Sequence, residues 1–503
     1  MPQFAYLHDD GVLFVSAKNL AAGQFNLPSL VENPSQTKFP ILYPLYLSAI
    51  WRINPNFPDN LRIANWFCWI TLVAGLVLAW RLYRSDGYRE RRIWILTGLL
   101  AVNPYFILFG CSMFSEMFFT VCLLATFLAA RKHSQPAWKS WMIVAGVAAG
   151  CAYLSRTAGI PLILSVPLWL IWKRQWRAAA VFAAAMAPFV IGWTLWARAH
   201  MPHTDDPTLL YYTDYLRFWA LNIRQSNPLV ILWKNVDQLV YGMGSLVLPK
   251  VFDVGPMKTL VQVIGVAMIV GLVRLVRRGI AVDYAMFALF SVGILLIWHY
   301  PPNERFVLPL FPLLLAGLVE ELDHIVQMLR GAFRHKDAGQ RIAGRVLAAG
   351  VATVFGAALA LQFYVTFVFL QESGEQKRAK LVDQRAAYTW IAANVPAEAG
   401  VLSYDDPLMY LYSGRRGNYM PLAPRWWYAE DHASNIGAYR DVAKYCRAHG
   451  LSYFYFTTGD LEREVGDEDK QAIQQSVAAN PELERVFQAG IGTVYRVLPA
   501  RID

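Results

Sequence analysis

The chain has 503 residues, of which 56% are hydrophobic and only 16% are charged, and its formal net charge is +10. Soluble domains carry about 25% charged residues, so this composition excludes a soluble enzyme of this size, a disordered protein and a collagen-like or disulfide-linked scaffold. The five cysteines show no CxxC or Cys/His spacing, and the sequence therefore indicates neither a zinc centre nor a redox centre.

Ten apolar segments predict an α-helical, multi-pass membrane protein, because a helix of about 20 apolar residues crosses the hydrocarbon layer of a bilayer. They lie at 63–80, 93–110, 114–130, 140–154, 157–172, 178–197, 258–273, 280–298, 306–320 and 346–370. The boundary between the fourth and fifth is the least distinct, because Arg156 interrupts that stretch. We expect residues 1–370 to form a transmembrane domain with about ten spans.

The basic residues gather in every second connection between these segments, at 81–92, 131–139, 173–177, 274–278 and 330–345. Connections rich in Lys and Arg stay on the cytoplasmic side of a membrane. The positive net charge is therefore explained by topology, and nucleic acid is not an expected partner. The non-cytoplasmic side then receives two long outer loops, 1–62 and 198–257, and the chain from residue 371 onward.

The first outer loop would have to cross the membrane without a preceding helix or signal peptide. We therefore expect one more helix upstream of Met1, which would make eleven spans with a cytoplasmic N-terminus. The second outer loop is too long for a passive connection, and its stretches 211–219 and 229–240 are expected to form helices lying on the membrane surface.

The last part of the chain, residues 371–503, has the pattern of a small soluble α/β domain outside the cytoplasm. Short alternating apolar stretches at 400–403, 452–456 and 493–497 predict strands. Two helix-like stretches, 384–394 and 436–449, separate them. Residues 407–421, which contain Gly414 and Gly417, predict a turn-rich connection.

Polar side chains at the outer ends of the apolar segments are the candidate functional residues, because polar groups are costly at membrane depth. On the charge-derived topology, four carboxylates and three permanent cations fall on this one side. The candidates are Asp9, Asp10, Lys38, Glu116, Arg156, His299, Glu304 and Arg305. Their shared side predicts one polar site at the outer membrane level.

Transfer of a sugar from a lipid phosphate is the chemistry that would use such a set. Lys38, Arg156 and Arg305 would hold the phosphate and stabilise its charge as it leaves. A carboxylate on the other side of the anomeric carbon would take the proton of the acceptor hydroxyl. Glu116 would orient the acceptor, tune the base or share a divalent metal ion with it.

Each candidate also has a simpler structural explanation. An acidic pair in a loop is usually solvated, and Glu116 at a helix start also favours the helix dipole. Arg156 and Arg305 are equally suited to anchoring lipid headgroups, and Lys38 to pairing non-specifically with lipid phosphates. His299 is more typical of an ordinary interfacial histidine than of a ligand.

The order of the motifs resembles the GT-C superfamily of membrane glycosyltransferases, in particular the bacterial relatives of protein O-mannosyltransferases and of lipid A aminoarabinose transferase. The resemblance covers about residues 5–320. It consists of an acidic pair in the first outer loop, Lys–x–Pro with aromatic residues, Asn–Pro followed by Ser–x–x–Ser–Glu, Leu–Ser–Arg–x–x–Gly, and Glu–Arg–Phe–x–x–Pro. Some members also carry a periplasmic domain after a last span.

The resemblance implies a role for each matching residue. Asp9 and Asp10 match the acidic pair, of which the first member is expected to be catalytic or metal-binding. Lys38 matches a lysine near the lipid phosphate, although Phe39 departs from the usual Lys–Pro–Pro. Glu116 matches the acid of the second outer loop. Two arginines match phosphate-contacting positions, Arg305 more closely than Arg156.

We therefore expect a glycosyltransferase of a bacterial inner membrane that uses a polyprenyl-phosphate sugar, with undecaprenyl as the favoured carrier and an extracytoplasmic lipid, glycan or protein as acceptor. Asp9, Asp10 and Glu116 form the predicted catalytic set, Lys38, Arg156 and Arg305 the predicted phosphate-binding set, and His299 and Glu304 further site residues. The sequence identifies no certain cofactor; a divalent metal ion, if one is used, would be held by Asp9 and Glu116.

Two other functions remain open at the sequence level. The first is a transporter or flippase for a lipid-linked or sugar substrate. Such proteins usually carry ionisable groups near the bilayer midplane within paired repeats, and this sequence shows no repeat. The second is a membrane-anchored binding protein whose soluble domain would use Asp405, Asp406, Arg415 and Arg416.

Overall fold

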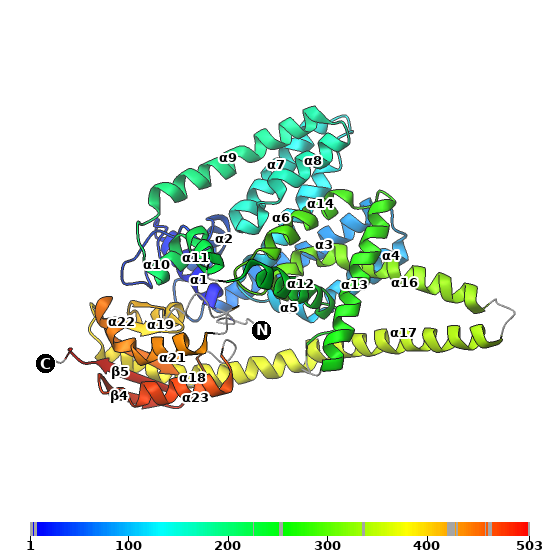
Figure 1. Ribbon diagram of the computed structural model, residues 1–503. Coiled ribbons are helices and arrows are strands. Elements are labelled where there is room, and N and C mark those ends of the chain that lie inside the picture. The colour runs from blue at the N-terminus through cyan, green and yellow to red at the C-terminus, as the bar shows by residue number, and fades with distance from the viewer. Residues whose placement is uncertain are drawn as a thin grey trace. The chain divides into compact units, whose positions relative to one another are not determined.

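The computed structural model describes residues 4, 8–224, 226–250, 255–333, 338–419, 428, 431–457, 459–460 and 465–500 (Figure 1). The chain divides into two compact units. The first unit combines Met1–Ala64, Leu195–Val230 and Ser373–Asp503. The second unit combines Asn65–Thr194 and Ile231–Glu372.

The second unit is helical, and every apolar segment that the sequence analysis singled out falls largely within helix. Its helices include the following: α3 (Leu61–Ser85), α4 (Glu90–Ala101), α5 (Pro104–Gly110), α6 (Ser115–Ala130), α7 (Trp138–Ser155), α8 (Leu162–Trp172), α9 (Trp176–His200), α12 (Pro228–Ser245), α13 (Gly255–Arg277), α14 (Val282–Leu296), α15 (Glu304–Val307), α16 (Phe311–Phe333) and α17 (Ala338–Tyr364). Helices α3, α9 and α12 extend across the boundary between the units.

Among the described residues, four helices are long and apolar enough to cross a membrane: α3, α9, α13 and the continuous stretch Ile342–Asn394. The count rises to five if α4 and α5, which are bent by 61° at their junction, form one broken span. Helices α6 and α14 are apolar but shorter. The protein is thus a multi-pass membrane protein, and the number of ten spans stays a prediction.

The break between α4 and α5 has a local cause in the sequence. Asn103 caps α5 by accepting a hydrogen bond from the Phe106 backbone N–H at 3.0 Å, and Pro104 occupies the first turn. Proline lacks the N–H that would continue the preceding helix and fits well at a helix start. The Asn103 side chain also donates to the Leu246 carbonyl at 2.6 Å, so the bend is held by a second helix end.

Helices α13 and α16 pack with their backbones in contact. A Cβ atom added at Gly271 would lie 1.9 Å from the Gly317 carbonyl oxygen, so no larger residue fits there. Small residues permit this close approach of helices in membrane proteins.

The first unit gathers both outer loops and the C-terminal part of the chain. Its helices are α1 (His8–Ala21), α2 (Leu42–Ile53), α10 (Pro207–Thr213), α11 (Tyr215–Arg224), α18 (Leu370–Asn394), which begins in the second unit, α19 (Asp406–Ser413), α21 (His432–Arg440), α22 (Val442–Ala448) and α23 (Asp467–Ala478). The predicted helix at 211–219 is divided at Asp214, whereas the one predicted at 229–240 lies within α12. Their position on a membrane surface stays a prediction.

In the described part of the first unit, the strands form a five-stranded mixed sheet in the order β2-β1-β3-β5-β4. Its strands are β1 (Gly400–Ser403), β2 (Gly417–Asn418), β3 (Leu451–Thr457), β4 (Leu483–Ala489) and β5 (Gly492–Val497). β1 runs parallel to β2 and β3, and β5 runs antiparallel to β3 and β4. The three predicted strands are confirmed; β2 and β4 had not been predicted.

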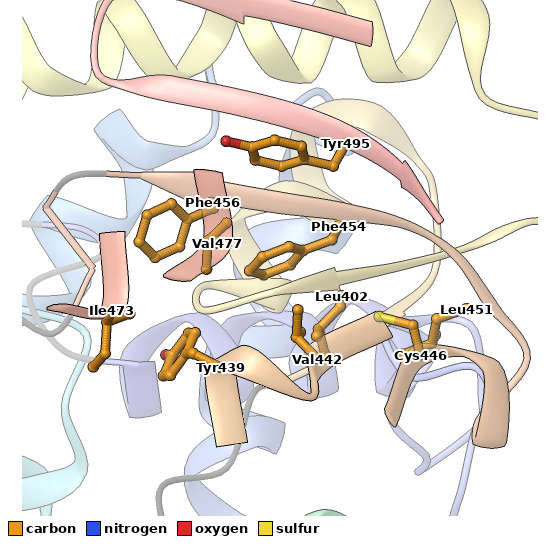
Figure 2. Close-up of a cluster of buried hydrophobic side chains, with 10 residues drawn as sticks. All are labelled: Leu402, Tyr439, Val442, Cys446, Leu451, Phe454, Phe456, Ile473, Val477 and Tyr495. Carbon is orange, nitrogen blue, oxygen red and sulfur yellow. The ribbon is translucent and has the colours of Figure 1, made fainter. Parts of the chain in front are cut away.

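Both faces of this sheet are covered by apolar side chains. Successive residues of β3 point to opposite faces, as in any strand: Phe454 and Phe456 belong to one buried cluster and Tyr455 to the other. Figure 2 shows the first cluster, in which strand residues pack against α21, α22 and α23; its members are Leu402, Tyr439, Val442, Cys446, Leu451, Phe454, Phe456, Ile473, Val477 and Tyr495. Residues of α18 and α19 cover the other face.

The predicted turn-rich connection at 407–421 is wrong in its first half, because α19 occupies Asp406–Ser413. Pro407 begins this helix rather than breaking one, and Gly414 ends it with a φ of 68°. Proline in the first turn and glycine just after the last turn are the typical boundaries of a helix. Residues 420 and 421 lie outside the described residues.

Candidate active site

The eight predicted site residues fall into two groups, one in each unit. Asp9, Asp10 and Lys38 belong to the first unit. The second unit holds the other five, Glu116, Arg156, His299, Glu304 and Arg305. The first-loop cluster consists of His8, Asp9, Lys38, Tyr211, Tyr212 and Asp406. The arginine cluster consists of Glu116, Arg156 and Arg305.

The two acids of the first-loop motif stand in the first turn of α1, where carboxylates are favoured by the helix dipole. Asp10 is fully buried and accepts a hydrogen bond from the Gly11 backbone N–H at 2.9 Å. The Asp9 side chain is 22% exposed, and its Oδ1 lies 3.9 Å from Lys38 Nζ. Asp9 is therefore the more exposed acid of the pair.

Lys38 lies against aromatic rings as well as beside Asp9. Its Nζ is 3.3 Å from the ring centroid of Tyr211 and 4.8 Å from those of Phe39 and Tyr215. A cation over an aromatic face is attracted by the ring quadrupole. Phe39, the residue that departs from the family pattern, is thus one of the three aromatic rings that surround the Lys38 ammonium group.

Hydrogen bonds fix the loop that carries Lys38 on two neighbouring helices. The Gln36 side chain donates to Ser16 Oγ of α1 at 2.9 Å. Thr37 Oγ1 donates to the Thr213 carbonyl at the end of α10 at 2.7 Å. The loop therefore presents Lys38 between α1 and α10.

A buried hydrogen-bonded trio adjoins the acidic pair. Asp406 Oδ1 lies 2.9 Å from His8 Nε2 and 2.5 Å from the Tyr212 hydroxyl, and these two groups are themselves 2.8 Å apart. Burial lowers the pKa of His8, but the hydrogen bond to Asp406 and the charges of three aspartates outweigh it and raise the pKa overall. Burial also raises the pKa of Asp405 to about 6, against the effect of His8.

Sequence reasoning did not select His8 or Tyr212, and it named Asp406 only for a different function. The available signals were positional. His8 directly precedes the acidic pair, and Asp406 follows β1 closely. The edge of a parallel sheet where strands end is a common place for functional groups.

In the second unit, the arginine cluster is centred on Glu116, in the first turn of α6. Glu116 is fully buried, and its Oε1 accepts from Arg305 Nε and from Arg156 Nη1. The three side chains of this cluster, two guanidinium groups and one carboxylate, sum to one formal positive charge. The cluster is therefore suited to binding an anion.

Local backbone structure places each arginine. Arg156 ends α7 in an extended conformation, with a φ of −161°. The glycine of its Leu–Ser–Arg–x–x–Gly motif is needed for packing, because a Cβ on Gly159 would lie 2.7 Å from the Tyr153 Cα. Asn303 caps α15 by accepting from the Arg305 backbone N–H at 3.1 Å. The Arg305 guanidinium lies over the ring of Phe114, 4.5 Å from its centroid.

The two remaining predicted residues make other contacts. Glu304 accepts a hydrogen bond from Ser245 Oγ at 2.9 Å. His299 is buried, with its ring 5.2 Å from Trp298 and 4.7 Å from Tyr300. Asn235 fixes this turn by donating to three carbonyls at the end of α14, including that of Trp298. A role of His299 and Glu304 in the site stays a prediction.

The two proposed metal ligands do not form a ligand set with their neighbours. Within the described ranges, no group of three or more His, Cys, Asp or Glu side chains is placed to hold a metal ion. Asp9 faces Lys38, and Glu116 binds two arginines. Each carboxylate thus already has a cationic partner.

The family model described as glycosyltransferase family 87 matches residues 57–319, which is more than half of the sequence. The chain belongs to glycosyltransferase family 87. The matched range includes the whole arginine cluster, whereas Asp9 and Lys38 precede it. No curated protein matches this family 87 chain.

Solved structures of two other glycosyltransferases share the fold of this family 87 member. ArnT from Cupriavidus metallidurans, solved bound to undecaprenyl phosphate, is 12% identical with a TM-score of 0.52, and the match covers 97% of this chain and 93% of ArnT. The archaeal oligosaccharyltransferase AglB from Archaeoglobus fulgidus, solved with an inhibitory peptide and a dolichol-phosphate, is also 12% identical with a TM-score of 0.52. That match covers 96% of this chain and 70% of AglB.

These findings confirm the predicted resemblance to the GT-C superfamily. The family 87 chain is a membrane glycosyltransferase of the GT-C type. The family match decides between the glycosyltransferase hypothesis and the two alternatives, a transporter and a membrane-anchored binding protein. The roles of the individual site residues stay predictions.

Proposed function

We propose that this glycosyltransferase moves a sugar from a polyprenyl-phosphate carrier to an acceptor outside the cytoplasm. The observation that carries the proposal is the arginine cluster, in which two guanidinium groups share one buried carboxylate, so that its three side chains sum to one formal positive charge. Lipid phosphates are also the molecules bound in two solved structures of similar fold: undecaprenyl phosphate in ArnT and a dolichol-phosphate in AglB. We favour undecaprenyl phosphate as the carrier.

In the proposed reaction, Asp9 is the general base. Its carboxylate takes the proton of the acceptor hydroxyl as the acceptor oxygen forms a bond to the anomeric carbon of the sugar. The bond between that carbon and the phosphate oxygen breaks, and its electron pair leaves with the polyprenyl phosphate. The products are the glycosylated acceptor, the free polyprenyl phosphate and a proton that Asp9 passes on to water.

Arg156 and Arg305 bind the donor phosphate and stabilise the charge that develops on it. Guanidinium groups suit this role because they form paired hydrogen bonds with phosphate oxygens. Within the proposal, Glu116 is the counter-ion that holds both arginines in place. It spaces and orients them before the donor arrives, rather than acting on the acceptor.

Lys38 has two uses compatible with its contacts. Its predicted contact with the donor phosphate remains part of the proposal. Its Nζ also lies 3.9 Å from Asp9, which suits holding the carboxylate of the base in place. In-line displacement needs the base and the leaving phosphate on opposite sides of the sugar, so these two uses of Lys38 are alternatives. Lys38 and the two arginines therefore need separate tests.

The direct test uses purified protein in nanodiscs with a synthetic polyprenyl-phosphate sugar, and mass spectrometry of the lipid products. The proposal requires release of polyprenyl phosphate together with a glycosylated product from lipid, glycan or protein acceptor fractions. Nanodiscs without the protein are the control. Failure of the wild-type protein to release polyprenyl phosphate with any of the acceptor fractions would refute the proposal.

The proposed orientation has its own test. Topology reporters inserted after residues 85, 135, 175 and 335 should report the cytoplasm, because basic loops stay inside. Reporters at residues 205 and 480 should report the outside. A cytoplasmic signal at 480 would overturn both the orientation and an extracytoplasmic acceptor.

A further inference from the structure

The trio of His8, Tyr212 and Asp406 joins three segments that are far apart in the sequence. His8 begins α1, Tyr212 lies in α10, and Asp406 begins α19 of the C-terminal domain, all within the first unit (Figure 1). Asp406 and Tyr212 are almost completely buried, and the His8 side chain is 13% exposed. A buried polar group that lacks its hydrogen-bond partner lowers the stability of the fold. Removing one side chain of the trio should therefore destabilise the other two.

The polar groups of the trio meet at one carboxylate oxygen. The Tyr212 hydroxyl donates to Asp406 Oδ1. The His8 tautomer that carries a hydrogen on Nε2 donates to the same oxygen, because a carboxylate oxygen accepts hydrogen bonds. Within the described residues, neither His8 Nδ1 nor Asp406 Oδ2 has a hydrogen-bond partner. The trio is therefore held through the single oxygen Oδ1.

Two further contacts attach the first outer loop to the C-terminal domain. A Cβ on Gly11 of α1 would lie 3.0 Å from Pro407 Cβ, so α1 and α19 already pack closely. The Gly417 backbone N–H of β2 donates to the Ser29 carbonyl at 2.7 Å, and Leu30 forms a parallel bridge with Gly417. The loop before Lys38 thus pairs at Ser29 and Leu30 with β2, the edge strand of the sheet.

The trio bears directly on Asp9, because His8 and Asp9 are consecutive residues in the first turn of α1. Helix ends fray when nothing holds them, and Asp9 would then sample many positions. The charged groups around His8 are Asp406, Asp405 and Asp9. The rings of Tyr211, Tyr212 and Tyr419 also face it, with centroids between 4.8 and 6.2 Å away.

We propose that His8, Tyr212 and Asp406 are positioning residues that hold the start of α1, so that the C-terminal domain completes the site around Asp9. This inference rests on the proposed function for its activity readout. It makes the C-terminal domain a required part of the catalytic site rather than an appended acceptor-binding module.

The chain supplies a matched control. Tyr445 of α22 shares a 2.8 Å hydrogen bond with Thr208 Oγ1 of α10. Tyr212→Phe and Tyr445→Phe therefore each remove one tyrosine hydroxyl that joins α10 to the C-terminal domain. Only Tyr212 also contacts His8. If the trio merely docks α10, the two variants should behave alike.

The kinetic test compares these variants with the same purified preparations and a polyprenyl-phosphate sugar donor. Tyr212→Phe should lower kcat about tenfold, in keeping with the loss of a hydrogen bond to a charged group, with little change in the donor KM. Tyr445→Phe should remain within about twofold of wild type. His8→Gln, whose amide can still donate, should retain more activity than His8→Ala. Equal losses in both tyrosine variants would overturn the inference.

Hydrogen exchange of the α1 peptide provides a readout that does not depend on activity. Tyr212→Phe and Asp406→Asn should speed exchange at residues 8–14, and Tyr445→Phe should not. Unchanged α1 exchange in both trio variants would overturn the positioning role even if activity fell. If wild-type protein transfers no sugar, the proposed function fails, and the exchange result still decides whether the trio holds α1.

Discussion

The first-loop cluster and the arginine cluster both set acids against cations, but they do so with opposite geometry. Asp9 is partly exposed and meets Lys38 at 3.9 Å. Glu116 is fully buried and binds two arginines through one oxygen. A partly exposed carboxylate can take up a proton, whereas a carboxylate bound by two guanidinium groups is suited to orienting them. On the proposed function, Asp9 therefore performs the proton transfer and the two arginines form the anion site.

The clusters also differ in how the chain builds them. The arginine cluster comes from helix ends of one helical unit, at the boundaries of α6, α7 and α15. The first-loop cluster needs the N-terminal helix, the loop before α2, the second outer loop and the C-terminal domain. A site assembled from so many segments depends on their docking, so its geometry is more easily disturbed from a distance.

The largest effect is expected from Asp9→Asn, which removes the proposed base with almost no change in size. Turnover should fall by about two to three orders of magnitude, the range for losing a general base. Product formation by the purified variant is the measurement. Asp10→Asn is the control and should matter less for turnover, because Asp10 is buried against the α1 backbone. Normal turnover in Asp9→Asn would remove the proposed role of the first-loop cluster.

Glu116→Gln distinguishes a counter-ion from a catalytic acid. Removing one partner of a buried ion pair costs about 3–5 kcal/mol, so the thermal unfolding temperature and the donor affinity should both fall. Asp237→Asn is a matched control in the same unit, because Asp237 pairs with the half-exposed Lys258 and should cost about 0–1 kcal/mol. A Glu116→Gln protein that folds and binds donor normally but does not turn over would instead support a catalytic Glu116.

Arg305→Gln tests the anion site itself. Donor affinity or turnover should fall about tenfold or more, because charge-assisted hydrogen bonds contribute about 1.5–3 kcal/mol. Arg305→Lys should recover only part of this loss, since lysine keeps the charge but lacks the planar fork. Donor titration in nanodiscs measures both. If neither donor affinity nor turnover changed in Arg305→Gln, the arginine would be a headgroup anchor and the phosphate would bind elsewhere.

The smallest expected effect is the pH dependence of the trio. The pKa of His8 is raised above its ordinary value of 6.5, so its stabilising contribution is complete below that value and is lost as pH rises through the raised pKa. The pKa of Asp405, raised to about 6, acts in the same direction: the free energy of unfolding falls as the pH rises towards that value. Thermal unfolding from about pH 5.5 to about pH 8.5 should show the gap between wild type and His8→Gln narrowing as pH rises. A gap that widens would contradict the ion pair with Asp406.

Much of the fold could be predicted because apolar length and strand alternation are local signals. Alternation alone predicts the strands at 400–403 and 493–497, whereas β2 is too short to show it, with only two residues. Pro407 and Gly414 predict a turn, but in the structure they stand at the start and just after the end of the helix α19. The number of spans does not follow from apolar length alone, since α6 and α14 are short.

The candidate site was predictable only in part. Glu116, Arg156 and Arg305 could be selected because charges at the ends of apolar segments are costly, and the structure brings these three together. His8 and Tyr212 carry no such signal, because neither is a permanently charged residue at the end of an apolar segment. Their importance comes from Asp406, almost 400 residues away from His8, and only the folded chain reveals that contact.

The division of labour between the clusters is the central claim, and equilibrium binding of a polyprenyl-phosphate sugar tests it most directly. Purified wild type, Asp9→Asn and Arg305→Gln would be titrated with the same donor in nanodiscs, without acceptor. The account predicts that Asp9→Asn binds the donor as tightly as wild type although its turnover is about two to three orders of magnitude lower, and that Arg305→Gln binds about tenfold more weakly. Weak binding by Asp9→Asn together with wild-type binding by Arg305→Gln would contradict it.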